Sequence, residues 1–124
     1  ERRQFGSRIV DFQGIEFMLA DMATDIMAAK SMLYRLAAEI DAGLDRKSAH
    51  ARASAVKLFT TEMAFRVLDK AQQIFGGRGL MRENPVERLV RDVRFERVWE
   101  GTSHIQKVVI AGQLNKRGLA NYVN

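Results

Sequence analysis

A long apolar repeat in the first third of the chain constrains the fold more than any other feature. Apolar side chains recur there at spacings of three and four residues: Phe12, Ile15, Leu19, Met22, Ile26, Ala29, Leu33, Leu36 and Ile40. This is the period of an α-helix that buries one stripe against a neighbouring helix at a small crossing angle. We expect this helix to begin after Gly6-Ser7 and to end at Gly43, because glycine suits the left-handed residue after a helix.

A second apolar repeat follows after a short polar turn. It consists of Ala53, Val56, Phe59, Met63, Val67, Ala71 and Ile74. Asp45 and Ser48 are equal candidates for its N-cap, and Gly76-Gly77 ends it. The short connection between the two repeats predicts an antiparallel hairpin of two long helices.

The remainder of the chain predicts a glycine-rich loop at 76–84 and two shorter helices. Asn84 and Pro85 suit the cap and first turn of the first of these helices, residues 95–100 are expected to be irregular, and the last helix runs from about 103 to 115. We therefore expect an all-α, up-down helical bundle forming one domain at 1–118, with a frayed tail at 119–124.

Composition excludes several classes of site. The chain has no cysteine and two histidines far apart in sequence, which leaves no disulfide framework and argues against a metal site. No apolar run is long enough to span a membrane. The net charge of +5 permits nucleic-acid binding, but between residues 78 and 97 arginines alternate with acids, which is typical of a salt-bridged surface. We expect no metal, no nucleic acid and no membrane span.

The first predicted helix carries more apolar surface than the other helices can cover. An exposed apolar surface of that size usually marks an interface. We expect a preceding helix, a partner subunit, or both, to cover it.

The stretch Trp99-Glu100-Gly101-Thr102-Ser103 offers a candidate for a general base. Thr102 or Ser103 can cap the helix that follows, and the N-terminus of a helix attracts anions and polar groups. Glu100 would then be a carboxylate held on a tight turn beside an aromatic ring. On these residues alone, a plain capped turn with a solvated glutamate is the simpler interpretation.

Four motifs, in order, resemble the C-terminal helical domain of acyl-CoA dehydrogenases. They are Arg2-Arg3-Gln4-Phe5-Gly6, the loop from Ala71 to Gly79, the helix from Pro85 to Asp92, and Glu100-Gly101-Thr102-Ser103-His104-Ile105-Gln106. In the family this four-helix bundle starts with a helix that precedes the first motif and follows an N-terminal helical domain and a β-domain. The resemblance therefore implies a fragment whose first bundle helix is missing, and which by itself neither retains flavin nor turns over substrate.

The resemblance implies an FAD enzyme that oxidises an acyl-CoA thioester to its trans-2-enoyl form. Glu100 matches the base that removes the α-proton. Its backbone N–H matches a donor to the thioester oxygen, acting together with a flavin hydroxyl. Gly101 matches the position where the substrate approaches the backbone closely. A turn glycine is the alternative reading of Gly101.

The resemblance also assigns cofactor contacts. Arg2 and Gln13 match residues that reach the adenosine diphosphate part of the flavin of a neighbouring subunit, and a loop along that dinucleotide matches Gln73, Ile74, Phe75, Gly76 and Gly77. Flavin contacts at the last helix match Thr102, Ser103 and His104. Helix capping, a surface charge at Arg2 and a flexible loop remain as alternatives.

The implied partners are an acyl-CoA substrate, an electron-transferring flavoprotein as acceptor, and further copies of the chain in a dimer or tetramer. The implied compartment is the bacterial cytoplasm, or the mitochondrial matrix in a eukaryote. Trp99, His104, Arg78 and Gly112 depart from the commoner family residues and leave the substrate open. The alternatives are an acyl-CoA oxidase of the same superfamily, a related flavin monooxygenase, which the retained Glu100 disfavours, and a non-catalytic basic interaction module.

Overall fold

The computed structural model describes residues 2–123 and is almost wholly helical. Its elements are β1 (Arg3–Gln4), β2 (Ser7–Arg8), the 3-10 helix η1 (Ile9–Asp11), α1 (Gln13–Asp41), α2 (Arg46–Phe75), the 3-10 helix η2 (Gly76–Leu80), α3 (Pro85–Glu96), α4 (Ser103–Arg117) and α5 (Ala120–Val123).

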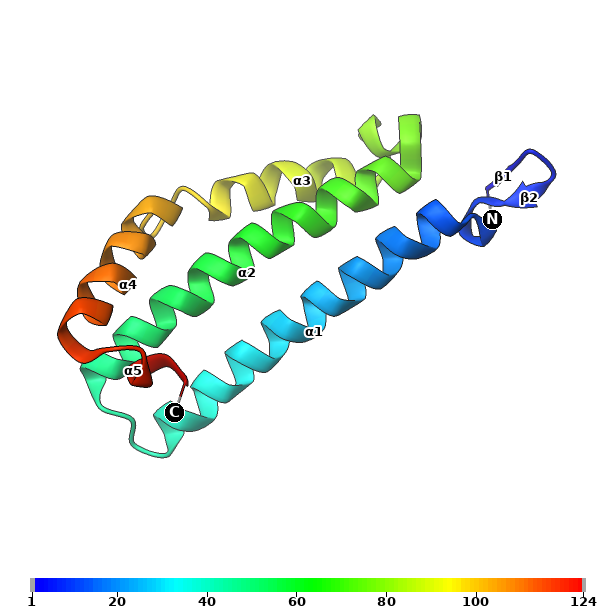
Figure 1. The fold of residues 1–124 in the computed structure, drawn as a ribbon. Helices are drawn as coiled ribbons and strands as arrows, with labels where there is room; N and C mark the ends of the chain where they lie inside the picture. The colour runs from blue at the N-terminus through cyan, green and yellow to red at the C-terminus, as the bar shows by residue number, and fades with distance from the viewer. Residues whose placement is uncertain (1, 124) are drawn as a thin grey trace.

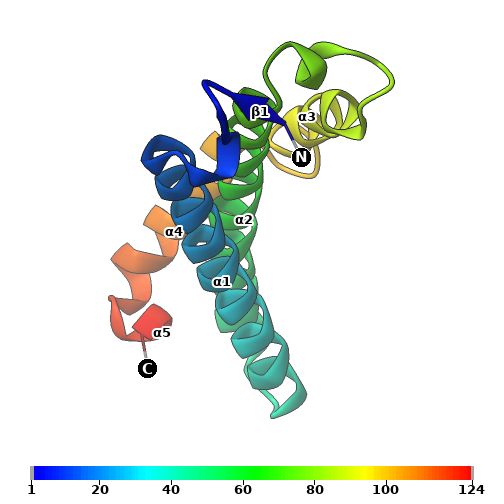
Figure 2. The ribbon, with the colours of Figure 1, turned by 90° about the vertical axis from the view of Figure 1, so that its right-hand side faces the viewer.

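The helix α2 is the centre of the bundle. It runs antiparallel to α1 on one side and packs against α3 and α4 on the other (Figure 1). A view from a quarter turn away shows α1 and α2 side by side along their length (Figure 2). The predicted all-α, up-down architecture is confirmed. Among residues 2–123, no helix combines the length and the apolar character needed to cross a membrane.

The start of α1 differs from the prediction. Residues 3–8 form a small antiparallel hairpin in which Arg3 pairs with Arg8 and Gln4 with Ser7. Phe5 and Gly6 form its tip with φ of +51° and +82°, the conformation that the tightest hairpin turns require at both central residues. The helix begins only after Phe12, where the apolar repeat itself starts, because the residues before it have no apolar stripe to bury.

The other helix ends follow local capping chemistry. The Asp45 side chain accepts hydrogen bonds from the backbone N–H groups of Lys47 and Ser48, so Asp45 is the N-cap of α2 and the choice between Asp45 and Ser48 is settled. Asn84 accepts from Val86 at the start of α3. That helix continues to Glu96, so the irregular stretch is shorter than expected.

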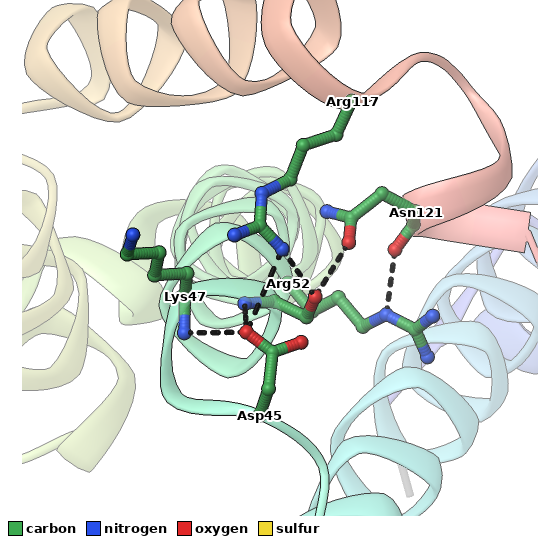
Figure 3. A network of polar contacts seen from close by, with 6 residues as sticks. Asp45, Lys47, Arg52, Arg117 and Asn121 are labelled. Carbon is green, nitrogen blue, oxygen red and sulfur yellow. Dashed lines mark hydrogen bonds and ion pairs between the residues drawn. The ribbon is translucent and has the colours of Figure 1, made fainter.

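The C-terminal tail, for which we expect fraying, contains a short helix in this structure. Ser48 donates a hydrogen bond of 2.7 Å to the Asn121 side chain, and Arg52 donates one of 2.7 Å to the Asn121 carbonyl. Arg117 donates to Ser48 at 3.0 Å and lies 3.5 Å from Asp45 (Figure 3). These contacts fasten α5 to the start of α2, so residues 120–123 form a packed helical turn; Asn124 lies outside the described residues.

The core is thin, and α1 leaves a long apolar face uncovered. The buried apolar residues are Ala29, Leu36, Ala51, Val56, Met63 and Val86. Large side chains on α1 stay exposed: Phe17, Leu19, Ile26, Met27, Leu33, Tyr34 and Ile40. The expected surplus of apolar surface is therefore present among the described residues.

One carboxylate on α2 contacts residues on both sides of the junction between α3 and α4. Glu62 accepts a hydrogen bond of 2.6 Å from the Ser103 hydroxyl and forms an ion pair of 2.8 Å with Arg97. The Ser103 hydrogen bond and then Arg97 hold the pKa of Glu62 below its ordinary value. Arg97 also stacks over the Phe65 ring at 4.8 Å. Three elements are thus joined at Glu62.

We predict that Glu62→Gln lowers the free energy of unfolding by about 1–2 kcal/mol at pH 7, because it replaces charge-assisted bonds with neutral ones. Because the pKa of Glu62 is lower in the folded state, its ionised carboxylate stabilises the fold fully at pH values above the unfolded pKa of about 4.3. This stabilisation is lost as the pH falls through the folded-state pKa. Urea unfolding from pH 7 to 3 should therefore show the variant converging on the parent at low pH. Glu83→Gln, the same change in an exposed loop residue, is the control. A pH-independent loss would contradict the role assigned to Glu62.

Candidate active site

Glu100 lies on a tight turn between α3 and α4, in a conformation that side chains usually avoid. Its φ is +51°, and the φ of the next residue, Gly101, is +90°. The left-handed conformation costs a residue with a side chain about 1–2 kcal/mol, so the surrounding structure has to hold Glu100 there. The Glu100 side chain is exposed.

The carbonyl groups of the turn are held from the inside by two side chains. The Lys57 ammonium group on α2 donates to the Trp99 carbonyl at 3.1 Å and to the Gly101 carbonyl at 2.7 Å. The Gln106 amide on α4 donates to the Glu100 carbonyl at 3.3 Å and to the Gly101 carbonyl at 3.1 Å. Gln106 is buried and Lys57 is half-buried. Three consecutive carbonyls are therefore anchored by hydrogen bonds to side chains of α2 and α4.

Gly101 is needed here for two reasons internal to the chain. Its positive φ favours glycine, and a Cβ atom at this position would lie 2.6 Å from the Gln106 amide nitrogen. Any other residue would push Gln106 away from the carbonyls that it binds. The predicted close approach of substrate at Gly101 remains a prediction.

The start of α4 is capped by its own residues. The Thr102 hydroxyl accepts from the Ile105 N–H at 3.3 Å, and the Ser103 hydroxyl donates to Glu62. His104 is exposed. The capping role considered for Thr102 is therefore present, and the Ser103 proton is already engaged within the chain. The flavin contacts predicted at these three residues stay predictions.

An aromatic pair borders the turn. The rings of Phe95 and Trp99 lie 4.9 Å apart, and the Trp99 indole N–H donates to Glu96 at 2.7 Å. Both rings are about half exposed. Two half-exposed rings therefore lie at the end of α3, immediately before Glu100 in the chain.

The other predicted cofactor residues gather around the end of α2. Arg2 donates a hydrogen bond of 3.1 Å to the Phe75 carbonyl, which brings the hairpin strand next to the glycine-rich loop. Gly76 has φ +60°, and a Cβ there would lie 2.8 Å from the Arg2 guanidinium. Arg2, Gln4, Gly77 and Arg78 line an open hollow of about 530 Å³. Two guanidinium groups beside bare glycine backbone suit a phosphate-bearing ligand.

The structure does not bring the two groups of predicted residues together. The glycine-rich loop and the Glu100 turn lie at opposite ends of α3 (Figure 1), a helix of about 18 Å at 1.5 Å per residue. Gln13 is the exposed first residue of α1, Gln73 is exposed and Ile74 is half-buried. One group is therefore organised around Arg2 and Phe75, and the other around Glu100.

Sequence reasoning missed the residues that hold the turn. Lys57 and Glu62 adjoin the apolar repeat of α2, next to Val56 and Met63, and a charge bordering a buried stripe is a signal that it has a partner. Gln106 belongs to the motif that carries Glu100, but no role was assigned to it. The partners of Lys57 and Glu62 lie some 40 residues away in the sequence. The periodic pattern alone could therefore not identify them.

Comparison with known proteins gives a consistent result. The sequence model described as "Acyl-CoA dehydrogenase, C-terminal domain" matches residues 1–115. The chain is 46% identical over 117 residues to the caffeyl-CoA reductase-Etf complex subunit CarC of Acetobacterium woodii, covering 94% of this chain and 30% of that protein. It is 42% identical over 114 residues to the short-chain specific acyl-CoA dehydrogenase of Clostridium acetobutylicum, covering 92% of this chain and 29% of that protein.

The fold is shared as well. The structure of butyryl-CoA dehydrogenase from Megasphaera elsdenii superposes with a TM-score of 0.87 at 37% identity, over 93% of this chain and 29% of that one. The chain thus spans about 30% of the length of the relatives it matches. The helical bundle, the two sets of predicted residues and these matches together show that the chain belongs to the acyl-CoA dehydrogenase family and corresponds to its C-terminal domain.

Proposed function

We propose that this chain is the C-terminal domain of an FAD-dependent acyl-CoA dehydrogenase in which Glu100 removes the α-proton of an acyl-CoA thioester. The observation that carries the proposal is the turn itself. Its carbonyls are anchored inward by Lys57 and Gln106, while Glu100 is exposed and follows the half-exposed Trp99 in the chain. A base on a rigid support can be aimed at one carbon atom.

The chain's own residues would each have a simple role. Glu100 accepts the proton from the carbon next to the thioester carbonyl, and its backbone N–H donates to the thioester oxygen, where negative charge develops. Gly101 leaves room for the substrate at the backbone. When bound, FAD supplies the acceptor for the hydride that leaves the β-carbon.

The residues present fit a flavin dinucleotide. Arg2 and Arg78 place two positive charges on the hollow beside Gly77, where backbone can approach phosphate oxygens closely. Gln13 and the loop from Gln73 to Gly77 lie at this end of the bundle, and Thr102, Ser103 and His104 lie at the other. Two groups separated by the length of α3, about 18 Å, could serve two cofactor molecules, each shared with another copy of the chain. This supports a homo-oligomer.

A second candidate is the reverse reaction, reduction of a 2-enoyl-CoA. It is favoured by the 46% identity to a subunit of a caffeyl-CoA reductase–Etf complex. The protonated Glu100 would then deliver a proton to the α-carbon, because a group that removes a proton in one direction returns it in the other. That relative also supports an electron-transferring flavoprotein as the redox partner. Oxygen uptake with acyl-CoA would instead identify an oxidase.

We predict that Glu100→Gln in the complete flavoprotein lowers kcat by about 10²–10⁴-fold, the usual contribution of a general base. Acyl-CoA binding should change little, because glutamine has almost the same size and keeps the backbone N–H. Bleaching of the flavin absorbance by acyl-CoA measures the effect, and Glu83→Gln is the control. Normal bleaching in the Glu100 variant would remove Glu100 from this role.

We predict that Arg2→Gln weakens FAD binding about tenfold, because it removes a charged donor next to the glycine-rich loop. Arg3→Gln is the matched control. It makes the same change in charge one residue along, at a side chain that is not among those lining the hollow beside Gly77. Fluorescence titration of the FAD-free protein measures both affinities. Equal losses in the two variants would show that only net charge matters.

A further inference from the structure

The Lys57 ammonium group differs from three other basic groups on α2 in what it contacts. Arg52, Arg66 and Lys70 each form an ion pair with a carboxylate. The polar contacts recorded for the Lys57 ammonium group within residues 2–123 are both with backbone carbonyls of the Glu100 turn. A half-buried positive charge is therefore directed into peptide groups next to the proposed base.

We propose that Lys57 is a positioning residue that strengthens the Glu100 backbone N–H as a hydrogen-bond donor, and so favours negative charge on the thioester oxygen. This inference rests on the proposed function, because that function places the substrate oxygen at this N–H. It adds a residue on α2 that does not touch the substrate.

The geometry follows from the planarity of the peptide group. In a trans peptide, C=O and N–H point in opposite directions, and no cis peptide occurs among the described residues. The Trp99 carbonyl belongs to the same peptide group as the Glu100 N–H. Because that carbonyl points inward to Lys57, the Glu100 N–H points away from Lys57. The same holds for the Gly101 carbonyl and the Thr102 N–H.

Charge adds to this orientation. A hydrogen bond accepted by a carbonyl polarises the whole peptide group and makes its N–H a stronger donor, and the effect is larger where water is partly excluded. A charged donor forms a stronger bond than a neutral one. Lys57 is half-buried and binds the two outer carbonyls of the turn, while the neutral Gln106 amide binds the central Glu100 carbonyl. Lys57 therefore polarises the peptide that carries the Glu100 N–H and, through the Gly101 carbonyl, the peptide that carries the Thr102 N–H.

Two substitutions separate polarisation from simple support of the turn. Lys57→Gln keeps a neutral donor that can bind carbonyls but removes the charge. Lys57→Arg keeps the charge. Lys70→Gln, the same change at an α2 lysine paired with Asp21, controls for loss of a positive charge on this helix.

The experiment uses the complete flavoprotein and two measurements. The first is the NMR chemical shift of the Glu100 amide proton without substrate. The second is the infrared carbonyl stretch of a bound acyl-CoA labelled with ¹³C at the thioester carbonyl, measured in the Glu100→Gln background so that no turnover occurs. We expect Lys57→Gln to move the amide proton upfield, to raise the carbonyl frequency, and in the active enzyme to lower kcat about tenfold, with KM within twofold.

Lys57→Arg should keep the amide shift, the carbonyl frequency and kcat close to the parent values. Lys70→Gln should change none of the three. Parent values for Lys57→Gln would overturn the proposal, and so would equal losses in the glutamine and arginine variants, which would mean that Lys57 only supports the turn. If Glu100→Gln proves fully active, the proposed function fails, but the amide shift still decides whether Lys57 polarises the Glu100 peptide.

Discussion

The structure of the candidate site depends on the inward orientation of three consecutive carbonyl groups at residues 99–101. Left-handed backbone at Glu100 is unfavourable, and four hydrogen bonds from Lys57 and Gln106 offset that cost. The same bonds direct the exposed edge of the turn, with its carboxylate and N–H groups, away from the bundle. The hydrogen bonds to these carbonyls therefore explain both why Glu100 keeps its strained backbone and why its carboxylate and N–H face outward.

The helix α2 is the support on which this arrangement is built. Within two turns it provides Lys57, which binds the carbonyls, and Glu62, which holds Ser103 and Arg97 on either side of the turn. Because α2 is also in contact with α1, α3 and α4, any movement of the turn would disturb the centre of the bundle. The position of Glu100 therefore depends on α2, the helix that contacts the other three long helices.

The helices also leave much apolar surface of α1 uncovered. The core of the bundle contains mainly small and medium side chains, and the face of α1 from Phe17 to Ile40 stays exposed. The predicted cofactor residues fall into two groups at the two ends of α3, neither of which encloses a ligand. These features agree with a domain whose relatives are about three times as long, and they place the proposed chemistry at exposed surfaces.

The sequence by itself determined the two long helices, the cap at Asn84, a cap at Thr102 or Ser103, and the motif around Glu100. These are local features, and residues within one or two helical turns decide them. Only the tertiary structure decided the hairpin before α1, the packed α5, and the roles of Lys57 and Glu62. The contacts of α5, Lys57 and Glu62 join residues separated by some 40 to 70 positions, and Arg2, next to the hairpin, binds the Phe75 carbonyl 73 positions away. Such pairings depend on how the helices pack, which a periodic pattern along one chain does not encode.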